Sequence, residues 1–226
     1  MSSKIVALIP VREGSKRVKN KNFRPFSNEE SLLHLKIRQL TRQSCLDEIY
    51  VSSNSKVAEK IAKEEGVKFL ERDPYMCSKD AKLYEYNTYM LNTIPGNPIV
   101  VWAMVTAPLF ENYDSAVKKF MELDKKNFDS LVTTIKYNDF LIDKNGRPIN
   151  CSFGHWHQLT QELRLTYQIT GSAYIALKSD QIEWKYWIGI RPYLYKISKY
   201  ESIDIDDLED FIIAETLYKS KINRSK

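Results

Sequence analysis

Basic side chains gather near the start of this 226-residue chain, in the segment IPVREGSKRVKNKN. Arg12, Lys16 and Lys21 are spaced four and five residues apart on a segment that can curl, so their charges can converge on one triphosphate. Ser15 and nearby backbone amides add further donors. A solubilising basic turn and a patch that binds nucleic acid are the alternative interpretations.

Acidic side chains form a second group near the end of the chain, in the segment ESIDIDDLEDF. Strand alternation places Asp204 and Asp206 on one face and Ile203 and Ile205 on the other. Two carboxylates on one face suit Mg²⁺, which prefers oxygen ligands and keeps phosphate and water in its remaining positions. An acidic helix start is the alternative, and both can hold because the two aspartates precede the expected helix. A triphosphate site and an Asp-x-Asp pair together are what metal-dependent nucleotidyl transfer requires.

The elements that must position these residues alternate along the chain. We expect strands at 4–10, 48–53, 67–70, 98–105, 130–135, 172–177 and 193–197, and helices at 31–43, 56–65, 84–91, 113–125 and 207–219. This order predicts a single α/β domain over residues 1–226, with a doubly wound, mostly parallel sheet of Rossmann-like type. In such a sheet ligands bind beyond the carboxyl ends of the strands, which is where the basic segment follows the first strand. Residues 138–170 break the rhythm, and we expect them to form a small insertion that packs on a second subunit or lies beside the substrate.

Composition narrows the class of protein further. The seven glycines allow neither a G-x-G-x-x-G motif nor a P-loop, so charged side chains must hold any phosphate. The apolar runs fall far short of the roughly 18 residues of a membrane span, and the start lacks the order of a signal peptide. We therefore expect a cytoplasmic protein without membrane contact. Three widely separated cysteines argue against a disulfide framework or a zinc site.

The two charged segments resemble motifs of the acylneuraminate cytidylyltransferases, the family that includes the CMP-sialic acid synthetases. In the family's first motif a strand ends in Pro-Ala-Arg, followed by Gly-Ser-Lys and then Lys-Asn. The matching positions here are Arg12, Gly14, Ser15, Lys16, Lys21 and Asn22. The family's Ser-Ile-Asp-Ile-Asp motif is complete at 202–206, and ERDPYMCSKD, VTAPL and TQEL resemble three further stretches between the two motifs.

The resemblance implies a CTP-dependent enzyme, usually dimeric, that joins CMP to an acidic sugar of the nonulosonic or sialic acid class and releases pyrophosphate. It implies that Arg12, Lys16 and Lys21 hold the triphosphate, with Asp206 among the catalytic residues. The implied nucleotide-side residues are Ser15, Asn22, Arg72 and Asp80. The implied substrate-side residues are Met104, Thr106, Gln161, Tyr167 and Tyr174. Asp204 and Asp206 are implied to bind Mg²⁺.

Departures from the family pattern lie on the sugar side. Met104 replaces a glutamine and Phe110 replaces a basic residue, which indicates a deoxy or more apolar acid.

Two other functions stay open. One is a cytidylyltransferase for a different acid, such as a 3-deoxy-octulosonate or a phosphonate. The other is a catalytically silent nucleotide or nucleic-acid binder, which the paired aspartates disfavour. For His155 and His157 we expect a structural or interface role.

Overall fold

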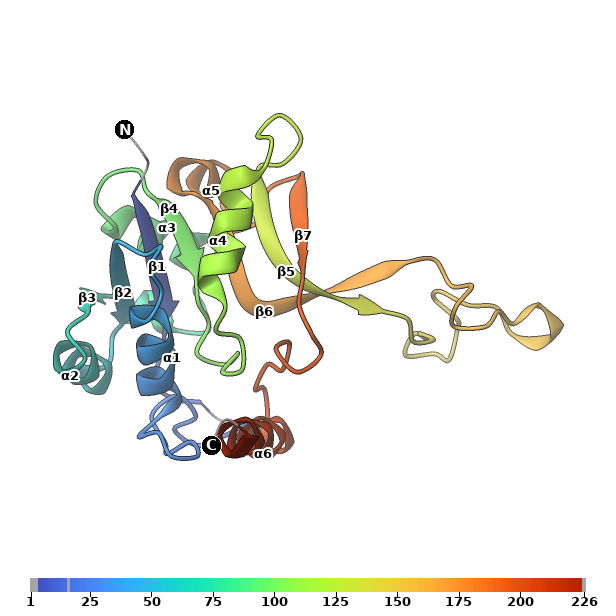
Figure 1. Cartoon of the computed structure of the whole chain (residues 1–226), viewed down its shortest axis with the longest axis horizontal. Helices are drawn as coiled ribbons and strands as arrows, with labels where there is room; N and C mark the ends of the chain where they lie inside the picture. Colours follow the sequence, from blue (N-terminus) through green and yellow to red (C-terminus); the bar gives the residue numbers. More distant parts are fainter. Residues whose placement is uncertain (1–3, 16, 225–226) are drawn as a thin grey trace.

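The computed structural model describes residues 4–15 and 17–224. Over these residues the chain forms a seven-stranded sheet with the order β3-β2-β1-β4-β6-β5-β7 (Figure 1). The strands are β1 (Ile5–Pro10), β2 (Glu48–Ser53), β3 (Lys68–Glu71), β4 (Ile99–Trp102), β5 (Ser130–Tyr137), β6 (Thr166–Leu177) and β7 (Pro192–Lys196). The helices are α1 (Leu32–Thr41), α2 (Lys56–Glu64), α3 (Leu83–Thr93), α4 (Tyr113–Glu122), α5 (Lys178–Trp184) and α6 (Leu208–Arg224), with short 3-10 turns η1 (Tyr75–Cys77) and η2 (Gly154–Trp156).

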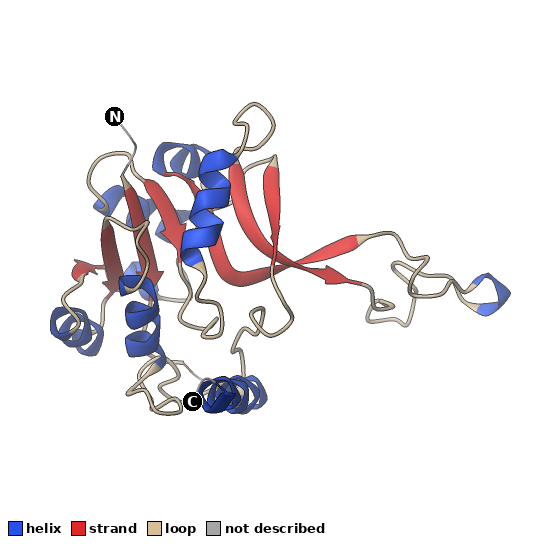
Figure 2. Ribbon diagram, in the orientation of Figure 1, coloured by secondary structure: helices blue, strands red, loops and turns tan. Residues whose placement is uncertain are grey.

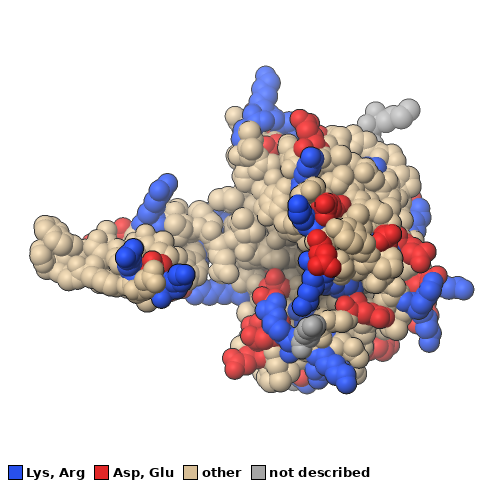
Figure 3. All heavy atoms as spheres, turned by 180° about the vertical axis from the view of Figure 1, so that it is seen from behind, with Lys and Arg blue, Asp and Glu red and all other residues tan. Residues whose placement is uncertain are grey.

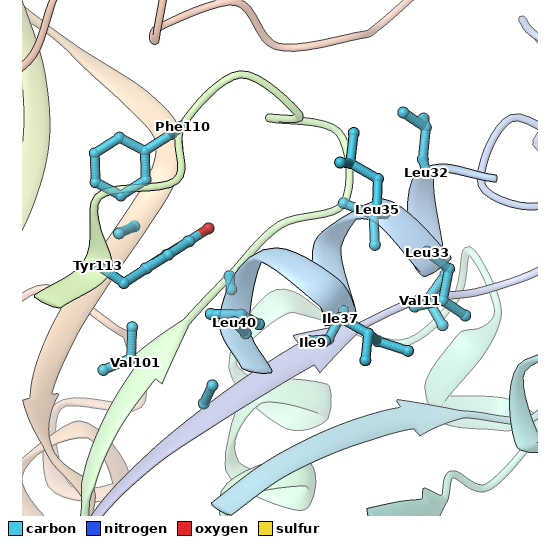
Figure 4. Packing of buried hydrophobic residues seen from close by; sticks show 14 of the residues in the cluster. Ile9, Val11, Leu32, Leu33, Leu35, Ile37, Leu40, Val101, Phe110 and Tyr113 are labelled. Atoms are coloured by element: carbon cyan, nitrogen blue, oxygen red, sulfur yellow. The ribbon is translucent and has the colours of Figure 1, made fainter. Parts of the chain in front are cut away.

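Helices cover both faces of the sheet, as Figure 2 shows, and this confirms the predicted doubly wound architecture. Strand β1 displays the two faces most clearly because its side chains alternate between two apolar clusters. Ala7 and Ile9 belong to the cluster that includes residues of α1, α2 and α4, part of which Figure 4 shows. Val6 and Leu8 belong to the cluster that includes residues of α3 and α5.

One strand departs from the parallel pattern. β1/β2, β1/β4, β2/β3 and β5/β7 pair in parallel, whereas β6 is antiparallel to both β4 and β5. Two neighbouring strands that follow each other in the chain pair antiparallel when no crossover connects them. The chain leaves β5 through residues 138–165 and returns along β6, so β6 runs antiparallel to β5. The prediction of a mostly parallel sheet is confirmed with this exception.

The sequence also predicts a helix cap at Ser31 and a helix end at Gly66, and the structure confirms both. Ser31 caps α1 by accepting from the His34 amide at 3.3 Å, and Gly66 has a φ of 69° just after α2, as a helix end favours. The apolar spacing of residues 56–65 also predicts that Val57 is buried, and this is wrong: Val57 lies in the first turn of α2 and is 47% exposed. The seven-residue helix α5 follows β6 without a break, and its shortness hides its period in the sequence.

Residues 138–165 project from the sheet as an arm (Figure 1). The predicted insertion, 138–170, was too long, because residues from Thr166 onward belong to β6 and pair with β5 up to Tyr137. Large apolar side chains are exposed along the arm and at its root: Ile142, Ile149, Phe153, Trp156, Leu159 and Leu165. Among the described residues no helix is both long and apolar enough to cross a membrane.

Candidate functional site at the carboxyl ends of the strands

The basic segment forms a folded loop directly after β1. Asn22 closes this loop, because its Nδ2 donates to the Arg12 carbonyl at 3.1 Å. A left-handed Asn20, with φ of 53°, turns the chain so that the amides of Phe23 and Arg24 both bond to its carbonyl. The Arg12 side chain is exposed and donates to the Cys77 carbonyl at 3.2 Å. The loop therefore places the Arg12 side chain at the predicted edge of the sheet, and Ser15 is half-buried within the loop.

Lys16, a predicted triphosphate residue, lies outside the described residues.

The acidic segment is held against this loop and against the loop after β4. The Ile205 amide donates to the Thr106 carbonyl at 2.8 Å, and Lys21 Nζ donates to the Ile205 carbonyl. Ile205 is buried while Asp204 and Asp206 are exposed, as predicted, but the segment is not a strand and Ile203 is only half-buried. The backbone between the two carboxylates is thus anchored from both sides, and both point away from the core.

Gly171 on β6 makes room for one of the two carboxylates. A Cβ atom at this position would lie 2.6 Å from Asp204 Oδ2 and 3.3 Å from its Cγ. Any larger residue at 171 would therefore push Asp204 aside. The sequence shows this glycine before a strand, but only the structure shows which side chain requires it.

Charges around the acidic segment are closely spaced. Lys21 is 9% exposed; burial lowers its pKa, and the nearby carboxylates of Asp206 and Asp204 raise it in part. Arg17 forms an exposed ion pair with Asp206, with 3.0 Å between Nη2 and Oδ1. Sequence reasoning placed Arg17 only in the basic cluster, because a pair between residues this far apart in the chain has no local signal.

Arg72 braces the backbone directly before Arg12. Its side chain is 5% exposed, and Nη2 donates to the carbonyls of Val11, directly before Arg12, and of Ser52, at 3.2 Å. Burial lowers the pKa of Arg72. Asp80 lies in the exposed loop that follows η1, where its amide bonds to Ser78 Oγ at 3.1 Å. Direct contact of Arg72 or Asp80 with a nucleotide stays a prediction.

The predicted substrate-side residues divide into two groups. Met104 and Thr106 are half-buried just after β4, and Tyr174 pairs with Trp102 across β4 and β6. Tyr174 packs 5.1 Å from the ring of Trp187; burial raises its pKa, and the charges of Tyr186 and Asp204 add to this shift. This group therefore lies beside the acidic segment.

Gln161 and Tyr167 form the other group. Gln161 is exposed on the arm, and Tyr167 lies in the part of β6 from which the arm extends (Figure 1). Within one chain they do not join the Asp204 site. His155 and His157 also lie on the arm, where His157 Nδ1 is 2.8 Å from the Ser152 carbonyl and its ring packs on Phe140.

Phe110 does not replace a cation that faces a substrate, contrary to the expectation. It is 1% exposed and packs edge-on against Tyr113, with ring centroids 4.9 Å apart.

Tyr86 on α3 is a residue that sequence reasoning missed. It is half-buried, and its pKa, raised by burial, is lowered in part by the nearby charges of Arg12 and Arg72. Its helix carries no motif, so only the packing of α3 brings it here.

A cavity of about 590 Å³ lies elsewhere, between α1, α4, α6 and the turn after β7. Gln39, Glu111, Tyr200 and Lys221 are among its lining residues. It does not coincide with the charged site, where the side chains of Arg12, Asp204 and Asp206 are exposed. We place the chemistry at the charged site, because that is where the carboxylates and cations converge.

Comparison with known proteins gives matches along most of the chain. The family model described as Cytidylyltransferase matches residues 6–145. An N-acylneuraminate cytidylyltransferase of Streptococcus agalactiae is 29% identical over 92% of this chain and 52% of its own length. The chain thus spans about half the length of the first curated relatives it matches. A pseudaminic acid cytidylyltransferase of Campylobacter jejuni is 24% identical over 96% of this chain and 97% of its own.

The fold also resembles solved structures. A CMP:2-keto-3-deoxy-manno-octonic acid synthetase complexed with CTP superposes with a TM-score of 0.70 at 10% identity, covering 97% of this chain and 100% of its own. At this identity the likeness concerns the fold alone.

Proposed function

Because the chain belongs to the cytidylyltransferase family, we propose that it transfers CMP from CTP to an acidic sugar of the nonulosonic or sialic acid class and releases pyrophosphate. One observation carries the proposal. The loop after β1 and the segment 204–206, at opposite ends of the chain, are bonded to each other through Lys21 and Ile205 at the carboxyl edge of the sheet. Cations for a triphosphate and carboxylates for a metal thereby share one site.

Each side chain has a role in this scheme. Arg12, Lys16 and Lys21 hold the triphosphate, with Ser15 as a further donor. Asn22 keeps the loop closed through its bond to the Arg12 carbonyl. Arg72 and Asp80 lie on the nucleotide side, and Arg72 acts there by fixing the backbone next to Arg12.

The carboxylates of Asp204 and Asp206 fit Mg²⁺. Both are exposed, and Gly171 leaves space for the Asp204 side chain. Two protein carboxylates with the other positions left to phosphate and water are typical of magnesium sites at nucleotides. When bound, Mg²⁺ neutralises charge on the phosphate oxygens and eases loss of the proton from the attacking sugar hydroxyl.

The acceptor is an acid held near Met104, Thr106 and Tyr174. Two of the similar proteins are named for N-acylneuraminate and for pseudaminic acid, which supports an acid of this class. Met104 in place of the family's glutamine removes one polar contact, which favours a deoxy or more apolar acid. A silent nucleic-acid binder is disfavoured, because the exposed carboxylates would repel phosphates that no metal bridges.

We further propose that the arm packs against a second copy of the chain, which would complete the site with Gln161 and Tyr167. Its exposed apolar side chains support this, since such patches mark interfaces, and Figure 3 shows few charged side chains at its outer end. Trp156, 72% exposed, is the test position. We expect wild type to elute as a dimer in size-exclusion chromatography with light scattering, and Trp156→Glu to shift toward monomer. A monomeric wild type would contradict this.

Pyrophosphate release tests the reaction itself. Each of the four nucleoside triphosphates is combined with a panel of sialic, pseudaminic, legionaminic and 3-deoxy-octulosonic acids. We expect release with CTP and at least one acid. No release with any pair, together with salt-sensitive DNA or RNA binding in a gel shift, would favour the binder. The cytoplasmic location stays a prediction.

A further inference from the structure

Lys36 is a lysine in the core of the protein. It lies on the inner face of α1 with Leu33, Ile37 and Leu40, and all four are 0% exposed. Burial lowers the pKa of Lys36 to about 7. A hydrophobic residue at this position would pack at less cost, because a buried charge must be desolvated and replacing one with an apolar residue often stabilises a protein.

The three donors of Lys36 converge on one segment. Nζ donates to the Ala107 carbonyl at 2.9 Å, the Phe110 carbonyl at 3.1 Å and the Tyr113 hydroxyl at 2.9 Å. Gln39, one turn further along α1, donates to the Pro108 carbonyl at 2.7 Å. Figure 4 shows the Tyr113 hydroxyl pointing toward α1. The segment 107–113, which joins β4 to α4, is therefore fixed from α1.

Two connections lead from this segment to the paired aspartates. Thr106, which directly precedes it, accepts the Ile205 amide at 2.8 Å, between Asp204 and Asp206. The Tyr113 hydroxyl donates to the Ser172 carbonyl at 3.3 Å, next to the glycine that makes room for Asp204. One connection holds the backbone of the acidic segment, and the other holds the strand on which Asp204 rests.

We propose that Lys36 is a positioning residue for the paired aspartates: it fixes residues 107–113 so that Thr106 and the Gly171–Ser172 strand hold Asp204 and Asp206 in the orientation that binds metal. This rests on the metal role proposed above. Lys36 touches no reacting atom, and it acts through the hydrogen bonds of the segment it fixes.

The test compares metal binding with stability in three variants. Lys36→Met replaces the lysine with an unbranched apolar side chain one atom shorter and removes its donors. Tyr113→Phe removes only the hydroxyl that links Lys36 to Ser172. Ile61→Ala, in α2 on the far side of α1, is the control, because Ile61 is 5% exposed and its loss destabilises the core without touching residues 107–113. Mn²⁺ serves as the probe for the magnesium site, and its binding in the presence of CTP is followed by electron paramagnetic resonance at a temperature where every variant is folded.

We expect Lys36→Met to weaken Mn²⁺ binding about tenfold, the factor that corresponds to ~1.4 kcal/mol. Tyr113→Phe should weaken it about threefold, and Ile61→Ala should leave it within about twofold of wild type although its melting temperature falls. A Lys36→Met protein with wild-type Mn²⁺ binding would overturn the proposal. If Lys36→Met does not fold, wild-type binding by Tyr113→Phe overturns it instead. A wild-type protein that binds no Mn²⁺ with CTP refutes the metal role itself, which is a distinct result.

Discussion

Gly171→Ala is expected to damage the metal site while leaving the fold intact. The new Cβ would lie 2.6 Å from Asp204 Oδ2, closer than the 3.0 Å limit that real Cβ contacts essentially respect, so the carboxylate must move by at least about 0.4 Å. Gly171 lies in β6 and its φ is not in the left-handed region, so alanine adopts this backbone without strain.

Gly171→Ala should change metal affinity much more than it changes the free energy of unfolding. Asp204 is exposed and can rotate into solvent, so we expect the free energy of unfolding to change by less than about 1 kcal/mol, with the gain of alanine over glycine in a strand offsetting part of any cost. Metal affinity should suffer more, because changes that reorient a metal ligand typically cost about 10–100-fold.

The assay is the Mg²⁺ dependence of pyrophosphate release, with urea unfolding measured in parallel. We expect the Mg²⁺ concentration for half-maximal rate to rise at least about tenfold, with little change in the unfolding midpoint. The control is the same substitution in an Asp204→Ala background, where it should add nothing. A wild-type Mg²⁺ dependence in Gly171→Ala would refute the assignment of Asp204 as a ligand.

Three further results are expected. Since the pKa of Lys36 is lowered to about 7 in the folded protein, the unfolded state binds one more proton between about pH 7 and 10. The stability of wild type relative to Lys36→Met should therefore rise by up to about 1.4 kcal/mol per pH unit there, measured by urea unfolding, and a flat difference would contradict the burial of the charge. Arg72→Met should lower the free energy of unfolding by about 2 kcal/mol, because buried carbonyls lose their donor; an unchanged urea midpoint would count against the bracing role. Arg17→Ala should strengthen Mn²⁺ binding without nucleotide by up to about fivefold, because an exposed ion pair worth at most about 1 kcal/mol no longer competes for Asp206; weaker binding would show that the pair supports the site.

The succession of strands along the chain and the two charged segments could be predicted, because each is recognised from the pattern of residues within a short stretch of sequence. The predicted bounds of β2 are those of the structure, and Asp204 and Asp206 are exposed around a buried Ile205 as predicted, although this segment is not a strand. Residues 166–170 could not be assigned to β6, because the projecting ribbon buries few of its side chains and has no apolar face for a period to show.

The connections within the site could not be predicted because they depend on tertiary packing. Phe110 looked like a substituted cation in the sequence, and the structure buries it against Tyr113. Lys36 has a charged side chain, yet it points inward, where three oxygens of residues 107–113 accept its hydrogen bonds. Neither fact has a signature within a single stretch of chain.

The most direct measurement is pyrophosphate release from CTP in the presence of the acid panel, carried out with wild type and Asp206→Asn and with and without EDTA. We expect wild type to release pyrophosphate with CTP and at least one acid, chelation to abolish the release, and Asp206→Asn to slow it by about two orders of magnitude or more. Release at the wild-type rate in EDTA, or by Asp206→Asn, would contradict a metal-dependent cytidylyl transfer at the paired aspartates.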